Sequence, residues 1–332
     1  MDAMPPPFRR GAGGGPEAGV SAAGRAAEAT GRNLRNWAVA AIIVGATATA
    51  LNPVFVRLSD LEPAGSAFHR MAWALPLMWA WMSLENKASP VAPSRGLRND
   101  RWLLIVCGLF FAADLTALHW SIRLTSVANA ILFLNAQPIY VVLGAWVLFG
   151  ERVSAGFLAG VATAMAGAAV MLGRSAELGG ERLLGDALGV VAGVCYAGYI
   201  LTASRLRART SSATINAWTC LIACPPLLAV ALATGQGVIP NSATGWALMI
   251  GLGVVSQACG QGFIVWGMAH LRAGFSAVVL LMAPVASAIF AWVLLAESMT
   301  AAQIAGIAVV LGGIYMAHRA SLAIQKAGSA GF

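Results

Sequence analysis

Apolar residues dominate the chain from residue 37 to residue 318, in runs of about 20 that short polar breaks separate. A helix needs about 20 such residues to cross the roughly 30 Å of hydrocarbon in a bilayer. The runs are apolar on nearly all sides, whereas the strands of a membrane barrel are short and alternate. The pattern predicts an all-α integral membrane protein with ten transmembrane helices, although counts of nine or eleven also fit. The predicted spans are 37–57, 64–84, 102–121, 126–148, 155–173, 186–204, 212–234, 244–268, 274–295 and 301–318.

The composition agrees with a membrane protein. Apolar residues make up 59% of the chain and charged residues 10%, with a mean hydropathy of +0.75, which exceeds what one soluble core requires. All five cysteines fall inside predicted spans, so the sequence suggests neither a disulfide framework nor a zinc site. Cys220 and Cys224 share a helix face, but no histidine or carboxylate lies near them in sequence. We expect no metal site and no cofactor.

The basic residues predict the orientation. Residues 1–36 are rich in Gly, Ala, Pro and Arg and contain no apolar stretch that could be a signal peptide, so we expect a disordered cytoplasmic tail. With that tail inside, 16 of the 21 Lys and Arg residues lie on the cytoplasmic side. This bias predicts a multi-pass protein of the cell inner membrane whose two tails, 1–36 and 319–332, are both cytoplasmic. It also explains the net charge of +8 through the lipid bilayer, without a nucleic-acid partner.

The chain contains an internal repeat. The stretch AWVLFGE at 145–151 returns as AWVLLAE at 291–297, and aligning Trp120 with Trp266 keeps the register without a gap. The repeats are 37–174 and 185–318, with five spans each. A unit with an odd number of spans must enter the membrane from the opposite face when it is duplicated, which predicts inverted topology. The aligned pairs include Pro138/Pro284, Trp146/Trp292, Glu151/Glu297 and Gly167/Gly313.

The repeat gives a meaning to two kinds of matched residue. Glu151 and Glu297 stand where the fourth helix of each repeat meets the fifth, beside Ser154 and Thr300, which can cap the next helix. We favour a structural role for this repeat junction, with gating contacts at the two membrane faces as the alternative. Three prolines interrupt predicted spans and invite a hinge or kink, namely Pro53, Pro138 and Pro284.

Charged residues inside the bilayer are costly without a partner. Asp114 is the only acid deep in a predicted span, and Arg70 lies at a similar depth. The two form either a structural ion pair or a functional site in which Asp114 binds a proton or a cationic substrate group. His119, with His69, lies close enough in depth to join this network as a proton relay, or is simply solvated.

Neutral polar residues near the middle of the spans are the preferred substrate contacts. Gln257 and Gln261 lie on one helix face, with Gly253 and Gly260 leaving room nearby. The alternative for all of these residues is hydrogen bonding between helices. The predicted substrate-binding residues are Asn135, Gln137, Tyr140, Tyr196, Ser256, Gln257 and Gln261.

Three stretches resemble a known family. AFHRMAWALPLMW in the second span, IRLTSVANAILFLNAQPIYVVLGAWVLFGERVS in the fourth and LRAGFSAVVLLMAPVASAIFAWVLLAESMT in the ninth closely resemble the EamA family of the drug/metabolite transporter superfamily. The resemblance covers residues 37–318. It implies alternating access across a central cavity lined by helices 1, 3, 4, 6, 8 and 9, and it favours export.

These observations predict a secondary transporter. With one buried acid matched by one buried base, a small neutral or zwitterionic metabolite such as an amino acid is the expected cargo. Facilitated and proton-coupled transport are both left open. The alternatives are a membrane-embedded enzyme, for which the sequence offers no HExxH, GxSxG or phosphate loop, and a non-transporting sensor or scaffold. We expect no enzyme activity.

Overall fold

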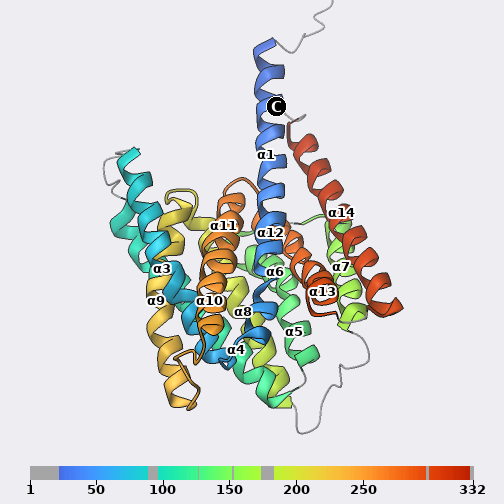
Figure 1. Ribbon diagram of the computed structural model, residues 1–332. Coiled ribbons are helices and arrows are strands. Elements are labelled where there is room, and N and C mark those ends of the chain that lie inside the picture. Colours follow the sequence, from blue (N-terminus) through green and yellow to red (C-terminus); the bar gives the residue numbers. More distant parts are fainter. Residues whose placement is uncertain are drawn as a thin grey trace, which may run out of the picture.

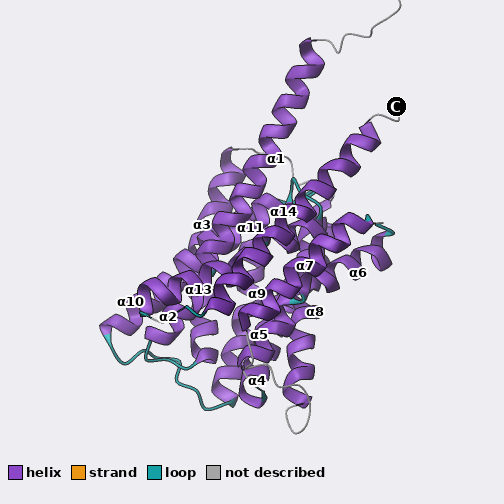
Figure 2. Cartoon of the chain, turned by 90° about the vertical axis from the view of Figure 1, so that its right-hand side faces the viewer, coloured by secondary structure: helices purple, strands orange, loops and turns teal. Residues whose placement is uncertain are grey.

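The computed structural model describes residues 22–88, 96–125, 127–151, 153–172, 183–296 and 299–329, and every regular element in these ranges is a helix (Figure 2). Eight helical segments are long and apolar enough to cross a membrane, and a shorter apolar helix lies at Ala155–Met171. The all-α membrane fold is therefore confirmed. The count of ten spans stays a prediction, because the helix that contains His69 and Arg70 is not among the eight.

Several of the expected spans consist of more than one helix. The elements are α1 (Ala22–Thr49), α2 (Asn52–Leu58), α3 (Pro63–Ala88), α4 (Gly96–Leu124), α5 (Val127–Asn135), α6 (Gln137–Phe149), α7 (Ala155–Leu172), α8 (Leu183–Leu206), α9 (Ser212–Ala233), α10 (Ala243–Gly251), the π-helix η3 (Leu252–Gln261), α11 (Gly262–Met268), α12 (Ala273–Val279), α13 (Met282–Leu295) and α14 (Ala301–Ser329).

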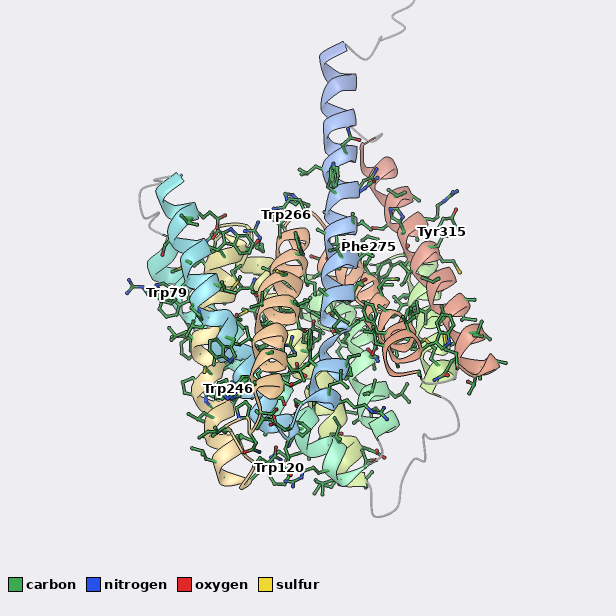
Figure 3. The ribbon with its side chains drawn as sticks, viewed as in Figure 1. Trp79, Trp120, Trp246, Trp266, Phe275 and Tyr315 are labelled. Atoms are coloured by element: carbon green, nitrogen blue, oxygen red, sulfur yellow. The ribbon has the colours of Figure 1, made fainter. Side chains whose placement is uncertain are left out.

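The helices form one bundle, and the first and last of them project from the same end (Figure 1). We call this end, from which the N-terminal part of α1 and the C-terminal part of α14 extend, the terminal end, and the opposite one the distal end. Trp120 lies at the distal end, whereas its repeat equivalent Trp266 lies toward the terminal end (Figure 3). Equivalent residues at opposite ends are what inverted repeats require.

Parts of both predicted tails are helical. Helix α1 begins at Ala22, so the prediction of a disordered segment does not hold for residues 22–36. This segment is rich in alanine, which has the highest helix propensity. Helix α14 likewise continues to Ser329, past the predicted end of the last span at residue 318. Residues 1–21 lie outside the described ranges.

The prolines lie directly after breaks in the helices, as predicted. Pro53 and Pro138 occupy the first turn of α2 and α6, where the missing N–H costs no hydrogen bond. Pro284 is the third residue of α13, after the break that follows α12. A helix break thus precedes each of the three prolines, and their role as hinges or kinks stays a prediction.

The repeat junction is built as the sequence indicates. Gly150 ends α6 in the left-handed conformation with φ 66°, and its repeat equivalent Ala296 ends α13 with φ 54°. The Ser154 hydroxyl accepts a hydrogen bond from Phe157 N at 3.2 Å, and Thr300 Oγ1 accepts one from Gln303 N at 3.2 Å. Both residues therefore cap the next helix, as predicted.

Small residues hold α7 against α14, the most extensively packed pair of helices. A Cβ built on Gly313 would lie 2.3 Å from Ala164 N, and one on Gly167 would lie 2.5 Å from Val310 N. Only glycine allows the two backbones to approach so closely, and this approach replaces the hydrophobic driving force that lipid does not supply between helices.

Gly313→Ala should destabilise the bundle, because the added methyl group collides with the α7 backbone; we expect a loss of about 1–3 kcal/mol. Thermal unfolding of the purified protein in detergent measures the change. The matched control is Gly312→Ala on the next residue, where a Cβ meets nothing within 4 Å and alanine raises helix propensity. Equal midpoints for the two variants would contradict the proposed packing.

Candidate functional site

Five of the predicted polar residues come together inside the bundle. Arg70 of α3 interacts electrostatically with Asp114 of α4 and Tyr196 of α8, and it donates a hydrogen bond to Gln257 of η3. The side chain of Gln261, also in η3, lies beside Tyr196 without a well-aligned hydrogen bond. Their helices are far apart in sequence but pack against one another. We call this group, together with Phe111, Tyr199, Cys220 and Ser256, the central polar cluster.

The two charges of the cluster are buried. Arg70 is 8% exposed and Asp114 4%, and they interact electrostatically. Arg70 Nε donates a hydrogen bond to Gln257 Oε1 at 2.9 Å, whereas Asp114 Oδ1 has no hydrogen-bond partner. At 1.5 Å per residue, Arg70 lies roughly 10 Å and Asp114 roughly 15 Å along their helices from the distal end. The ion pair that the sequence suggested stays a prediction.

Aromatic rings form one wall of the cluster. The Arg70 guanidinium lies over the Phe111 ring, 5.6 Å from its centroid. Phe111 contacts Tyr199 with ring centroids 4.8 Å apart, and Tyr199 stacks on Tyr196 at 5.8 Å. Sequence reasoning identified Tyr196 as a candidate substrate contact but missed Phe111. Its position three residues before Asp114, on the same face of α4, could have indicated it.

Several polar atoms of the cluster have no hydrogen-bond partner. Ser256 Oγ, Tyr199 OH and both amide atoms of Gln261 are buried without a hydrogen-bond partner, in addition to Asp114 Oδ1. Buried polar groups are normally paired, and each unpaired one costs about 1–3 kcal/mol. Unmet groups gathered around two buried charges are what a site for a polar ligand requires.

A π-helix presents the polar residues from the second half of the chain. Ser256, Gln257 and Gln261 all belong to η3 and are at most 1% exposed. Close approach of neighbouring backbones makes this possible, since a Cβ on Gly260 would lie 2.8 Å from Thr49 and one on Gly253 2.5 Å from Trp73. Wide helical turns of this kind are often found at functional sites.

The three candidates from the fourth predicted span lie at the break between α5 and α6. Asn135 ends α5, Gln137 begins α6 and is buried with Oε1 unpaired, and the Tyr140 ring packs on Gly193 of α8. Tyr140 also packs against the apolar core that contains Phe111 and Tyr199. Their role in binding stays a prediction.

His119 belongs to a second cluster, near the distal end. Its Nε2 lies 2.9 Å from Gln236 Nε2, and the same glutamine accepts a hydrogen bond from Ala64 N at 2.9 Å through Oε1. His69 Nε2 lies 2.7 Å from the Val238 carbonyl oxygen. Sequence reasoning missed Gln236, because it stands in a short connection between helices with no motif to mark it.

Glu151 lies at the end of the bundle where α6 meets the beginning of α12. It lines a small cavity with Arg272, Phe157 and Phe275. Its repeat equivalent Glu297 lies outside the described residues. Among the described residues no group of three or more His, Cys, Asp or Glu side chains could hold a metal ion.

A protein of known crystal structure has the same fold. The two align with a TM-score of 0.72 at 19% sequence identity, over 87% of this chain and 97% of the other. At this identity the likeness concerns the fold alone.

Curated relatives are transporters by name. An uncharacterized transporter of Archaeoglobus fulgidus is 26% identical over 79% of this chain and 91% of its own length. A probable terminal-alkyne amino-acid exporter of Streptantibioticus cattleyicolor is 27% identical over 88% of this chain and 96% of its own length. The pseudopaline exporter of Pseudomonas aeruginosa is 25% identical over 82% of this chain and 92% of its own length.

The model of the EamA-like transporter family matches twice, at residues 36–173 and 183–319, which together cover most of the chain. These two matches correspond to the two repeats found in the sequence. This multi-pass membrane protein therefore belongs to the EamA-like transporter family, and with it to the drug/metabolite transporter superfamily.

Proposed function

We propose that this protein is a secondary transporter that exports small neutral or zwitterionic metabolites, such as amino acids, by alternating access. The observation that carries the proposal is the central polar cluster, in which Arg70 and Asp114 are buried together with unpaired hydrogen-bonding groups. Exporter relatives for an alkyne amino acid and for pseudopaline support both the direction and the class of cargo.

The cluster favours a cargo that carries both charges. Arg70 donates through Nε to Gln257, and no hydrogen bond from its terminal guanidinium nitrogens is found among the described residues. A planar guanidinium fork matches a carboxylate. Asp114 Oδ1 is unpaired and can accept from an ammonium group. A zwitterion supplies a partner to each buried charge, whereas a singly charged cargo leaves one of them without compensation.

The membrane setting follows from the same proposal. Both termini lie on the cytoplasmic side of the cell inner membrane, so that the terminal end of the bundle faces the cytoplasm and the distal end the exterior. The excess of Lys and Arg on the side of the termini supports this orientation. Proton coupling, through Asp114 or His119, is the energy source that the buried titratable groups favour.

Purified protein in liposomes should release internal amino acids selectively. Vesicles are loaded with a labelled mixture of amino acids and related metabolites, and efflux is followed with and without a pH gradient. Selective release above that of empty liposomes is expected, and acceleration by the gradient would support proton coupling. Folded protein that releases none of the solutes would overturn the amino-acid proposal.

Substitution of each charge should alter recognition of one end of the cargo. Asp114→Asn should remove the preference for an amino acid over its N-acetyl derivative. Arg70→Gln should remove the preference for an amino acid over its carboxamide derivative. Each loss should be at least about tenfold, since removing one partner of a buried charge pair is costly. Competition of the unlabelled analogues with labelled efflux measures both preferences.

Asp186→Asn is the matched control for this experiment. Asp186 is also a buried acid, 5% exposed, but it accepts a hydrogen bond from Thr125 Oγ1 at 2.7 Å at the beginning of α8, outside the central polar cluster. Selectivity should be unchanged in this variant. If Asp114→Asn and Asp186→Asn had equal effects, the assignment of the ammonium group to Asp114 would be wrong.

A further inference from the structure

The connection between α9 and α10 holds the two halves of the bundle together at the distal end. We call residues 234–241 the distal loop. The loop belongs to the second repeat, and its partners belong to the first: Gln236 contacts Ala64 and His119, Val238 contacts His69, and Asn241 N donates to Asp60 Oδ2 at 2.7 Å.

Packing of the loop on α3 is tight. A Cβ built on Gly65 would lie 2.3 Å from the Gly237 carbonyl oxygen, so the loop backbone rests directly on the first turn of α3. Gln236 is 6% exposed, His69 5% and His119 8%. Beside them, a surface hollow lined by Asp60, Glu62 and Gln236 opens to solvent. The contacts that hold the loop are thus buried but close to water.

The hydrogen bonds fix the protonation state of His119. Ala64 N can only donate, so the amide atom of Gln236 that faces it must be the acceptor Oε1. The other amide atom, Nε2, then carries hydrogens and faces His119 Nε2. That histidine nitrogen must therefore accept, which requires a neutral ring with its proton on Nδ1.

Protonation of His119 is incompatible with this arrangement. A proton on His119 Nε2 would face the amide hydrogens of Gln236, and turning the amide over would place those hydrogens against Ala64 N–H. Either way at least one of the two hydrogen bonds is lost. His69 behaves differently, because its Nε2 faces a carbonyl oxygen and donates in the neutral and the protonated ring alike.

We propose that Gln236 and His119 form a latch that closes the distal end of the transport path, and that protonation of His119 releases it. Charged and titratable groups on the surrounding elements are Arg123 on α4, Glu62 and Asp60 before α3, His69 on α3 and Asp186 at the beginning of α8. Of these, Arg123 and Glu62 interact electrostatically with His119, and their charges have opposite signs.

The latch gives the proposed transporter a gate that acid on the distal side opens. Loss of the Gln236 contacts weakens the attachment of the loop to the first turn of α3, which the contacts of Val238 and Asn241 alone then maintain. The role as a gate rests on the proposed transport function, but the acid-sensitive contacts do not. They can be measured in the absence of any cargo.

Hydrogen exchange of the full-length protein, followed by mass spectrometry, tests the latch directly. Peptides that cover residues 63–66 and 234–241 report the Ala64 amide and the distal loop. Protection is expressed relative to the intrinsic exchange rate at each pH. On acidification from about pH 8 to about pH 5 the wild-type protein should lose about tenfold in protection, because protonation of His119 breaks hydrogen bonds.

Three variants separate the latch from other effects of acid. His119→Gln can still accept from Gln236 but does not titrate, so its protection should be the same at both pH values. Gln236→Met, which has a similar size but makes no hydrogen bond, should be unprotected at both. His69→Gln, the matched control, should keep the pH dependence of the wild-type protein.

The results decide between the proposals. A pH-dependent loss of protection that persists in His119→Gln, or that is missing in the wild-type protein, would overturn the latch. If protection behaves as expected but folded protein in liposomes exports no cargo, the latch stands and the proposed transport function is wrong.

Discussion

The burial of two opposite charges is the constraint on which the rest of this structure depends. Arg70 and Asp114 are both less than 10% exposed in a bundle of largely apolar helices. Each charge needs compensation, and the chain supplies it from distant segments: Gln257 from the π-helix, and a ring face from Phe111. The compensation is incomplete, since Asp114 Oδ1 stays unpaired. Under the proposed function, the bound cargo would complete this arrangement.

Small residues allow the helices to pack closely enough for this arrangement. The π-helix carries its glutamines inward because Gly253 and Gly260 let the neighbouring helices come close, and α8 does the same with Gly193 against Tyr140. The helix breaks at Pro53, Pro138 and Pro284 divide three elements without exposing long stretches of unpaired backbone, since each proline stands in the first turn after its break. Close packing and short breaks together allow polar groups inside a bundle that remains apolar on its outside.

Much of this could be predicted from the sequence, because hydrophobic length, proline and internal repetition are local signals. The α-helical membrane fold, the three interruptions, the caps at Ser154 and Thr300 and most members of the central polar cluster were all indicated by residue type and position. Contacts between distant segments were not. In the sequence, Phe111 is one apolar residue among many in α4, and only the structure shows that Arg70 lies over its ring. Gln236 lies in a loop that carries no recognisable sequence pattern. The depth estimate that grouped His119 with Asp114 did not indicate Gln236, because depth along a helix does not specify which neighbour a side chain faces.

The two polar clusters are joined by one helix. His69 and Arg70 are consecutive in α3, yet the first contacts the distal loop and the second contacts the π-helix, so the second repeat holds α3 at two adjacent residues. A rigid-body movement of α3 that releases one contact also displaces the other residue, because the two are consecutive in one helix. A ligand that displaces α3 when it binds Arg70 would therefore also shift the equilibrium of the loop. By reciprocity, whatever opens the loop changes the affinity of the central polar cluster for that ligand by the same factor. The covalent continuity of α3 thus links the two polar clusters.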